Sequence, residues 1–312
     1  MLTFTQRKQM AAKKCGIHYE ENEMDYIVAN INNADKLFQN ASRRPWTRKE
    51  KRANLTSGKQ YYQIASDMYR VADVRCRQSN DSNVIMPLTE VRSEHEWNKM
   101  NSYPHSGMFP THFFIRGNDE IGIYPTPAEN ITDGIIVAYE PRIRDMGVED
   151  IEFTANVTEN SVDIESTATD PQTHEPIDVF APYMEENWYA FRTDGKDGNY
   201  YKIQKVIDGQ HAKLENNYLG NTATDAPFKM GQVPPYPEEF HEAAVNYACF
   251  NFFAMRKDTD SAAMYRTLFE QAMEQYKTRY GNKTVSGVIT PGAKRMPTIG
   301  DVFAESTLTE GV

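Results

Sequence analysis

The chain has 312 residues, a hydrophobic content of 39% and a formal net charge of −10 at pH 7. Its mean hydropathy of −0.68 and the lack of any run of about 18 apolar residues argue against a membrane protein, and its first residues offer no apolar signal-peptide region. The 15 Phe and 18 Tyr favour a folded core over disorder, and the acidic balance argues against a dedicated nucleic-acid binder.

An amphipathic helix is predicted within the first 45 residues. Its apolar positions recur at spacings of four, three and four, which places them along one face: Ile27, Ile31, Ala34 and Phe38. The helix should end before Pro45, because the residue that precedes a proline is driven out of the helical region.

Short strands are predicted between residues 60 and 139. Tyr69 and Val71 share one parity of the alternating pattern. Val74 and Cys76 share the other parity, which predicts a β-bulge near residues 72–73. The remaining strand patterns, with a turn at 117–119, cover residues 60–64, 112–116, 121–123 and 135–139.

Residues 147–233 differ in character from the rest of the chain. Between Asp145 and His241 there are 19 Asp and Glu but only 6 Lys and Arg. Runs that alternate apolar and polar residues recur about every ten residues, separated by Gly and Asn turns, which is typical of a small sandwich or barrel. The alternating pairs are Val162 and Ile164, Trp188 and Ala190, Tyr201 and Ile203, and Ala212 and Leu214.

Two helices are predicted after residue 237. The first, from Phe240 to Ala254, is apolar nearly all round and should therefore be buried. The second should have its N-cap within Asp258-Thr259-Asp260-Ser261 and end with Gly281 as its C′ residue. Because the connection between them is short, the two helices should form an antiparallel hairpin.

These elements predict an α+β protein. Its core is a helical bundle, built from the N-terminal helix and the C-terminal hairpin, with the early strands leaning on the helices and an all-β sandwich or barrel inserted. The corresponding domains are residues 1–146 with 234–281 as a discontinuous core, 147–233 as the inserted β-domain, and 282–312 as an extended C-terminal tail.

Three parts of the chain, spanning about residues 24–281, resemble head-to-tail adaptor proteins of tailed bacteriophages. The helix pair that begins with Pro234-Pro235-Tyr236-Pro237 and continues through Ala243-Ala244 to Arg256-Lys257-Asp258 is similar to the end of such adaptors. Residues 200–224 resemble a small β-module of phage neck and tail proteins, although 165–170 lacks the glycine that the module usually carries. The β-rich half is matched by Gly58-Lys59-Gln60-Tyr61-Tyr62, Phe113-Phe114-Ile115-Arg116-Gly117 and Ile121-Gly122-Ile123-Tyr124-Pro125.

The resemblance implies a virion protein of the head–tail neck, made in the host cytoplasm, and not an enzyme. Such proteins form a ring, typically of twelve copies, that binds the portal protein and extends the DNA channel. The implied partners are the portal, neighbouring copies of the chain, a downstream tail or stopper protein and, transiently, packaged DNA. No membrane and no cofactor is implied.

Two segments are candidates for the contacts of such a ring. Residues 1–60 carry 12 Lys and Arg against 6 Asp and Glu, and the most basic stretch is predicted to be a loop that meets the portal or DNA: Arg43, Arg44, Trp46, Arg48, Lys49, Lys51 and Arg52. A protein partner is favoured, because strong phosphate contacts would hold DNA that has to slide. The alternative is a solvated loop.

The C-terminal tail is the second candidate. It carries apolar residues that a free linker does not need and that suit docking: Ile289, Met296, Ile299, Val302 and Phe303. The alternative is a tail without a docking role.

Other candidate sites are weaker. A zinc motif beginning at His241-Glu242 would need a histidine where Val245 stands. Asp258 and Asp260 suit a helix cap better than an EF-hand, and residues 194–199 suit a tight turn better than a calcium site. The three cysteines lie far apart in the sequence and predict neither a metal pair nor a disulfide framework: Cys15, Cys76 and Cys249.

Two other functions remain open at this stage. One is a neck or tail decoration with a glycan-binding face on the β-domain, formed by Trp188, Tyr189, Tyr200 and Tyr201. Strand alternation puts Trp188 and Tyr189 on opposite faces, so at least one of them belongs to the core. The other is a cell-wall hydrolase, for which the sequence offers no catalytic residues to name.

Overall fold

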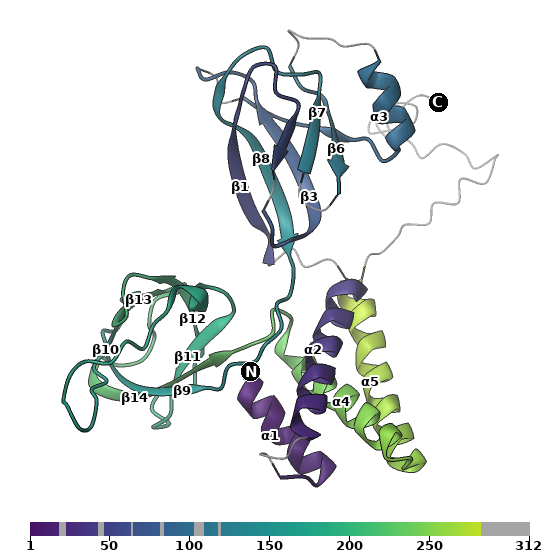
Figure 1. Ribbon diagram of the computed structural model, residues 1–312. Helices are drawn as coiled ribbons and strands as arrows, with labels where there is room; N and C mark the ends of the chain where they lie inside the picture. The colour runs from purple at the N-terminus through teal and green to yellow at the C-terminus, as the bar shows by residue number, and fades with distance from the viewer. Residues whose placement is uncertain are drawn as a thin grey trace, which may run out of the picture. The chain divides into compact units, whose positions relative to one another are not determined.

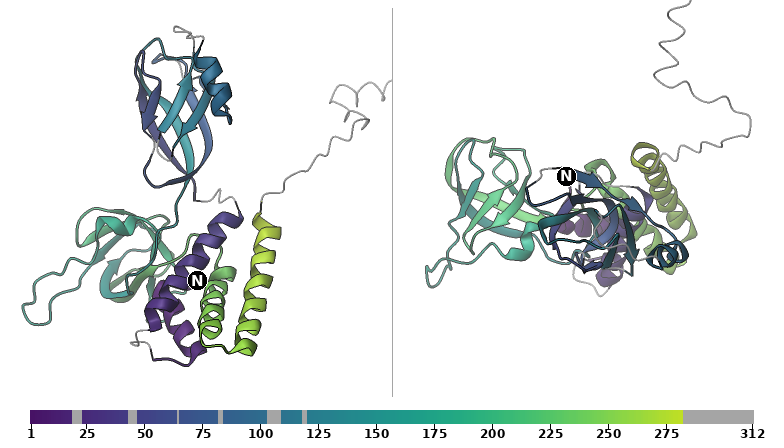
Figure 2. Two further views of the ribbon diagram at one scale, coloured as in Figure 1. Left: turned by 45° about the vertical axis from the view of Figure 1, so that its right-hand side comes forward. Right: turned by 90° about the horizontal axis from the view of Figure 1, so that it is seen from above.

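Helices from the two ends of the chain pack together. The computed structural model describes residues 1–18, 23–42, 47–63, 65–81, 84–102, 109–117 and 120–281. Within these ranges α1 and α2 lie against α4 and α5, as Figure 1 and Figure 2 show. This confirms the predicted packing of N-terminal on C-terminal helices. The bounds are Phe4–Cys15 for α1, Glu23–Ala41 for α2, His241–Met255 for α4 and Thr259–Tyr280 for α5.

The predicted apolar stripe of α2 faces the C-terminal helices. Its four residues are fully buried, and three of them pack in one cluster with Ala244 and Ala248 of α4. Phe38 lies in a second cluster, where its ring stacks on Tyr236 at 4.7 Å and meets Tyr276 edge-on at 4.9 Å. The large side chains among them, Ile27, Ile31 and Phe38, each contribute about 1.5–3 kcal/mol through their burial.

The hairpin of α4 and α5 confirms the predicted helix pair. A short 3-10 turn, η3 (Glu238–Phe240), leads into α4, whose faces are buried in both helical clusters. Asp258 caps α5 by accepting a hydrogen bond from the backbone N–H of Ser261 at 3.1 Å. Gly281 ends α5, but its backbone is extended, with φ −61°, and not in the left-handed conformation typical of a C′ glycine.

The helix α1 was not predicted. Its start is a capping box, in which the Thr3 hydroxyl accepts from the Gln6 N–H at 3.3 Å and the Gln6 amide accepts from the Thr3 N–H at 3.0 Å. The pattern was hidden because its buried face contains Arg7 between Phe4 and Ala11. The Thr-x-x-Gln spacing was the available signal.

The strands before residue 142 form two sheets with a core of their own. One has the order β1-β8-β3-β4 and the other β2-β7-β6-β5. Apolar side chains from both sheets meet in one cluster, separate from the two helical clusters. The bounds are β1 Lys49–Leu55, β2 Tyr61–Gln63, β3 Met68–Arg77, β4 Ile85–Pro87, β5 Thr89–Glu90, β6 His112–Arg116, β7 Glu120–Tyr124 and β8 Ile131–Pro141.

Two local features of these sheets connect sequence and structure. The register of β3 against β8 shifts between Val71 and Asp73, which confirms the predicted bulge. The helix α3 (Glu94–Asn101), absent from the prediction, buries Trp97, whose ring stacks on Phe114 at 5.4 Å. A single buried aromatic in a polar stretch of eight residues gives too little periodicity to predict a helix.

The strands β9 to β14 close into a barrel, one of the two predicted alternatives. The order is β10-β13-β12-β11-β14-β9, and all pairs are antiparallel. The interior is filled by large side chains that include Trp188, Tyr218 and Phe228. The bounds are β9 Ile151–Val157, β10 Asp163–Ser166, β11 Trp188–Arg192, β12 Tyr201–Val206, β13 His211–Leu214 and β14 Ala223–Gln232, with a 3-10 turn η2 at Pro182–Glu185.

Among the described residues, no helix combines the length and the apolar content that crossing a bilayer requires.

Candidate functional site

The predicted basic loop is partly a strand. Arg43, Arg44 and Trp46 lie outside the described residues. Arg48 is exposed just before β1, whereas the remaining members of the segment, Lys49, Lys51 and Arg52, lie on β1 and pair with β8. The strand pattern was hidden because β1 is a sheet edge, where charged side chains are common.

Strand alternation divides the charges of this segment between two faces. Lys49 donates to Glu186 at 2.7 Å and to Asp67 at 3.2 Å. Although partial burial opposes it, these two carboxylates raise the pKa of Lys49. Arg52 points to the other face, 3.9 Å from Glu50.

Two charged residues of the segment, Arg48 and Lys51, differ from Lys49 and Arg52 in their surroundings. Within the part of the chain that the structure describes, Arg48 and Lys51 have no carboxylate partner, and both are exposed. They are therefore the described members of the segment that are best placed to meet an acidic partner.

A groove of about 530 Å³ lies beside Lys49; we call it the junction groove. Its lining combines residues near β1, residues of the barrel and the segment that leads into α4. Ion pairs such as Lys202–Glu215 at 3.0 Å and Arg144–Glu186 at 3.2 Å stand in or beside it. This mixed charge suits a polar protein segment better than a nucleic acid. The charged lining residues are Arg48, Lys49, Arg142, Lys202, Glu185, Glu186, Glu215 and Glu238.

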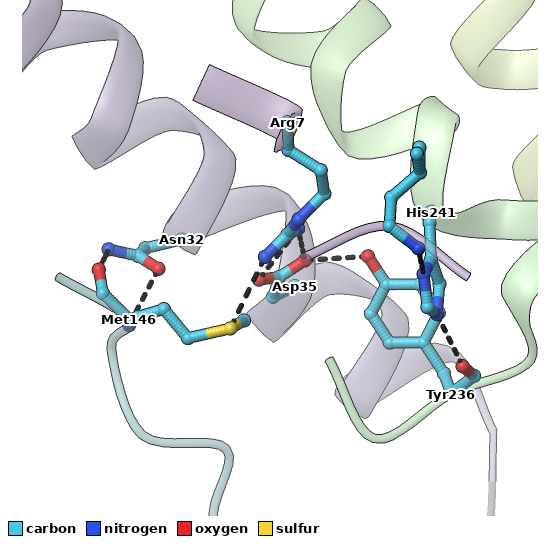
Figure 3. Close-up of polar contacts among 7 residues, drawn as sticks. Arg7, Asn32, Asp35, Met146, Tyr236 and His241 are labelled. Carbon is cyan, nitrogen blue, oxygen red and sulfur yellow. Dashed lines mark hydrogen bonds and ion pairs between the residues drawn. The ribbon is translucent and has the colours of Figure 1, made fainter. Parts of the chain in front are cut away.

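A buried polar network lies where the chain enters and leaves the barrel (Figure 3). Arg7 of α1 is fully buried and donates to both carboxylate oxygens of Asp35 on α2, at 2.9 and 3.2 Å. Asp35 also accepts from the Tyr236 hydroxyl at 2.6 Å, and Arg7 contacts the Met146 sulfur at 3.3 Å. We call this set, with His241, the junction network.

The charges of the pair depend on each other. Burial raises the pKa of Asp35, and the hydrogen bonds from Arg7 and Tyr236 oppose that shift. Burial also opposes the charge on Arg7, but Asp35 outweighs it and raises the pKa of Arg7. Nη1 of Arg7 donates to both carboxylate oxygens, and Asp35 raises the pKa of Arg7, so we describe the pair as guanidinium and carboxylate.

His241 closes the network in one defined tautomer. Its Nδ1 accepts from the Leu2 N–H at 3.1 Å, and its Nε2–H donates to the Tyr236 carbonyl at 2.9 Å. Because the first bond uses a lone pair on Nδ1, the imidazole is neutral. Burial accordingly lowers the pKa of His241 to about 4.

Amide side chains of α2 hold the chain before the barrel. Asn32 donates to the Met146 carbonyl at 2.9 Å and accepts from the Met146 N–H at 3.0 Å. Two helical turns later, Gln39 donates to the Pro141 carbonyl at 3.4 Å and accepts from the Ile143 N–H at 3.2 Å. The seven-residue spacing puts both amides on one face of α2, so the segment runs along the helix.

The start of α1 holds the next residues. The Thr3 hydroxyl donates to Asp150 at 2.7 Å, and the Asp150 N–H donates to Thr5 at 2.8 Å. The N-terminal amine of Met1 pairs with Glu238 at 2.9 Å, on the segment that leaves the barrel. Both connections of the barrel are thus fixed to the helices by polar contacts.

Removal of the Thr3 hydroxyl tests this attachment. Thr3→Ala should lower the free energy of unfolding by about 1–2 kcal/mol, because it removes the cap of α1 together with a bond to Asp150. Thr3→Ser, which retains the hydroxyl, should lose a small part of that. Urea denaturation followed by circular dichroism measures both, and equal losses for the two variants would contradict the assignment.

The residues of the weaker candidate sites contribute to the core or to turns of the fold. Val245 is buried, and the described residues contain no group of three His, Cys, Asp or Glu placed to hold a metal ion. In the 194–199 turn, Asp194 pairs with Arg192, and Asp197 accepts from Tyr201 at 2.6 Å. These carboxylates therefore stabilise a turn between strands.

The four aromatics proposed as a glycan-binding face do not share one surface. Trp188 and Tyr201 are buried in the barrel, with exposed fractions of 0% and 4%. Tyr189 and Tyr200 are half-buried. The expectation of a joint aromatic face is therefore wrong, because inward alternation uses half of the set for the core.

The docking residues of the predicted tail, from Ile289 to Phe303, lie outside the described residues. The junction network was missed by sequence reasoning. A signal existed, since Asp35 follows Ile31 by four residues and so lies on the apolar stripe of α2. A charged residue on such a stripe needs a buried partner.

One comparison with known proteins gave a match. A family model described as SU10 adaptor protein matches residues 11–162, from within α1 to just after β9. A search of curated proteins found no match.

Proposed function

From the premise that residues 11–162 belong to the SU10 adaptor protein family, a family of phage head–tail adaptors, we propose that the chain forms a ring beneath the portal. The family match is the observation that carries this proposal. In this role copies of the chain, twelve in a ring, join the head to the tail and continue the DNA channel. The family is structural, so the function is assembly and not catalysis.

The described structure supports separate roles for the helices and for the barrel within such a subunit. The helices provide a rigid body, and residues 147–233 act as an inserted domain mounted on it. Buried and partly buried hydrogen bonds of Thr3, Asn32 and Asp35 support this, because they attach the chain to α1 and α2 on both sides of the barrel. A barrel held in this way provides a binding surface for the tail-side partner.

The portal contact is assigned to the basic segment and the tail. Arg48 and Lys51 are exposed and lack carboxylate partners among the described residues, and Arg43 and Arg44 add charge in the sequence. An acidic protein surface suits them, since exposed charges mainly set association rate and orientation. The tail after Gly281 adds apolar anchors for docking.

Charge reversal tests the basic segment. Arg48→Glu with Lys51→Glu should weaken binding to the portal about tenfold at low salt, because two attractive pairs become repulsive. The matched control reverses Lys205 and Lys257, which are exposed elsewhere and change the net charge equally. Biolayer interferometry on immobilised portal measures both, and the difference should shrink at high salt.

Imaging tests the ring itself. The full chain mixed with portal should give a ring on one portal face in negative-stain micrographs, and truncation after Gly281 should reduce its occupancy. Portal particles without a ring, at chain concentrations well above those of the portal, would refute the proposal. Binding that is identical for the truncated and the full chain would refute the docking role of the tail.

A further inference from the structure

Two cysteines that are 234 residues apart in sequence meet in the helical core. The sulfur atoms of Cys15 and Cys249 lie 3.4 Å apart, within hydrogen-bonding distance, and both residues are free thiols. Cys15 is the last residue of α1, and Cys249 lies in the middle of α4. Sequence spacing gave no hint of this pair.

Small side chains make the approach possible. Ala11 and Ala12 of α1 face Ala244 and Ala248 of α4 in the same buried cluster as the two cysteines. These residues let α1 lie close along α4. Cys76 is also buried, but it belongs to the core between the two sheets and serves as an internal reference.

The two thiols differ in reactivity. The hydrogen bond with Cys249 lowers the pKa of Cys15, with burial opposing and Arg256 and Lys14 supporting the shift. The same hydrogen bond and burial raise the pKa of Cys249. Cys15 is 7% exposed at a helix end, whereas Cys249 is completely buried. Cys15 is therefore the thiol that an external reagent meets first.

We infer that Cys15 and Cys249 form a reversible disulfide that locks α1 onto α4. The oxidant is a low-molecular-weight disulfide, RSSR. The Cys15 thiolate attacks one of its sulfurs, which forms a mixed disulfide and releases RS⁻. Cys249 then loses its proton and attacks the Cys15 sulfur, which releases a second RS⁻. Two protein thiols are oxidised by two electrons, and two RSH leave with the two protons.

The lock acts on the junction network. The helix α1 carries Arg7, which binds Asp35, and it follows Thr3, which binds Asp150. Linking α1 covalently to α4 keeps these contacts from opening. In the proposed role the bond forms after the particle leaves the reducing cytoplasm. That timing rests on the proposed function, whereas the bond itself does not.

Oxidation of the isolated full chain tests the inference without any portal. The folded chain is incubated with oxidised glutathione, unfolded in N-ethylmaleimide, digested and analysed by mass spectrometry. We expect one alkylated cysteine, Cys76, and one linked peptide pair containing Cys15 and Cys249. The oxidised chain should also melt roughly 5–10 °C higher than the reduced chain, because the link closes a very long loop.

Single variants separate the roles of the two thiols. In Cys249→Ser, Cys15 should retain one glutathione, since the resolving thiol is missing. In Cys15→Ser, no linked peptide should form and the melting temperature should not respond to the oxidant. Three alkylated cysteines in the oxidised wild type, a persistent glutathione adduct on it, a link between two chains, or an unchanged melting temperature would overturn the lock.

Discussion

Arg7→Met should lower the free energy of unfolding by about 3–5 kcal/mol, because Asp35 is left as a buried carboxylate without its cation. The exposed fraction of Asp35 is 1%, so water cannot replace the guanidinium. The Tyr236 hydroxyl alone supplies one donor to a group that accepts several. Urea denaturation at neutral pH, followed by circular dichroism, measures the loss.

A neighbouring ion pair provides the matched control for this prediction. Lys8, the next residue of α1, pairs with Glu149 at the surface. Lys8→Met should cost less than about 1 kcal/mol, because the Glu149 carboxylate that would lose its partner is half-exposed and remains hydrated. The double variant Arg7→Met/Asp35→Leu should recover most of the stability, since no buried charge remains. A loss for Arg7→Met that is no larger than that for Lys8→Met would contradict the assignment.

The pH dependence of Arg7→Met has a definite sign. Burial already raises the pKa of Asp35, and removing Arg7 takes away the main opposing influence. The folded state of the variant then binds a proton more tightly than the unfolded state does. Its deficit relative to wild type should therefore be largest at neutral pH and shrink as the pH falls and Asp35 becomes protonated.

The parts of the fold predicted from sequence are those in which one face is consistently apolar. The stripe of α2, the all-round apolar α4 and the alternating strands of the barrel each bury the residues that the pattern selected. The bulge at Val71–Asp73 was visible for the same reason, because a change of parity cannot occur within a regular strand. Elements that bury one face against a core therefore show a regular apolar pattern in their own sequence.

The elements that escaped prediction carry polar residues where a pattern expects apolar ones. The buried face of α1 includes Arg7 and Thr5, and β1 is a charged edge strand. Their stability comes from partners elsewhere in the chain, namely Asp35, Asp150 and β8. Such partners are defined only by tertiary structure, which is why local periodicity could not supply them.

The same limit applies to the candidate site. Arg7 and Asp35 are separated by 28 residues, and Asp35 and Tyr236 by 201 residues. The basic segment was identified from composition, but composition could not show that Lys49 is committed to Glu186 while Arg48 and Lys51 are not. Strand formation divides the segment, and only the fold determines which charges stay available to a partner.

Lowering the pH from about 6.5 to about 4 should cost the wild type about 3 kcal/mol through His241 alone. The pKa of this histidine is lowered in the folded state, so the unfolded state takes up a proton over this range while the folded state does not. The contribution is fully present above the unfolded pKa and is lost as the pH falls towards the folded value. Protonation would also abolish the bond that Nδ1 accepts from Leu2.

The measurement compares the slope of unfolding free energy against pH for three proteins. In His241→Gln the mean slope between pH 6.5 and 4 should flatten by about 1 kcal/mol per pH unit, because an amide still offers a donor and an acceptor but does not titrate there. The third protein is the control variant His95→Gln, in which the replaced histidine is exposed on α3 and lies outside the junction network. Carboxylates contribute equally to all three proteins, so the difference isolates His241. Equal slopes for His241→Gln and wild type would mean that the folded state takes up a proton on this imidazole as readily as the unfolded state does, and the neutral junction network would have to be abandoned.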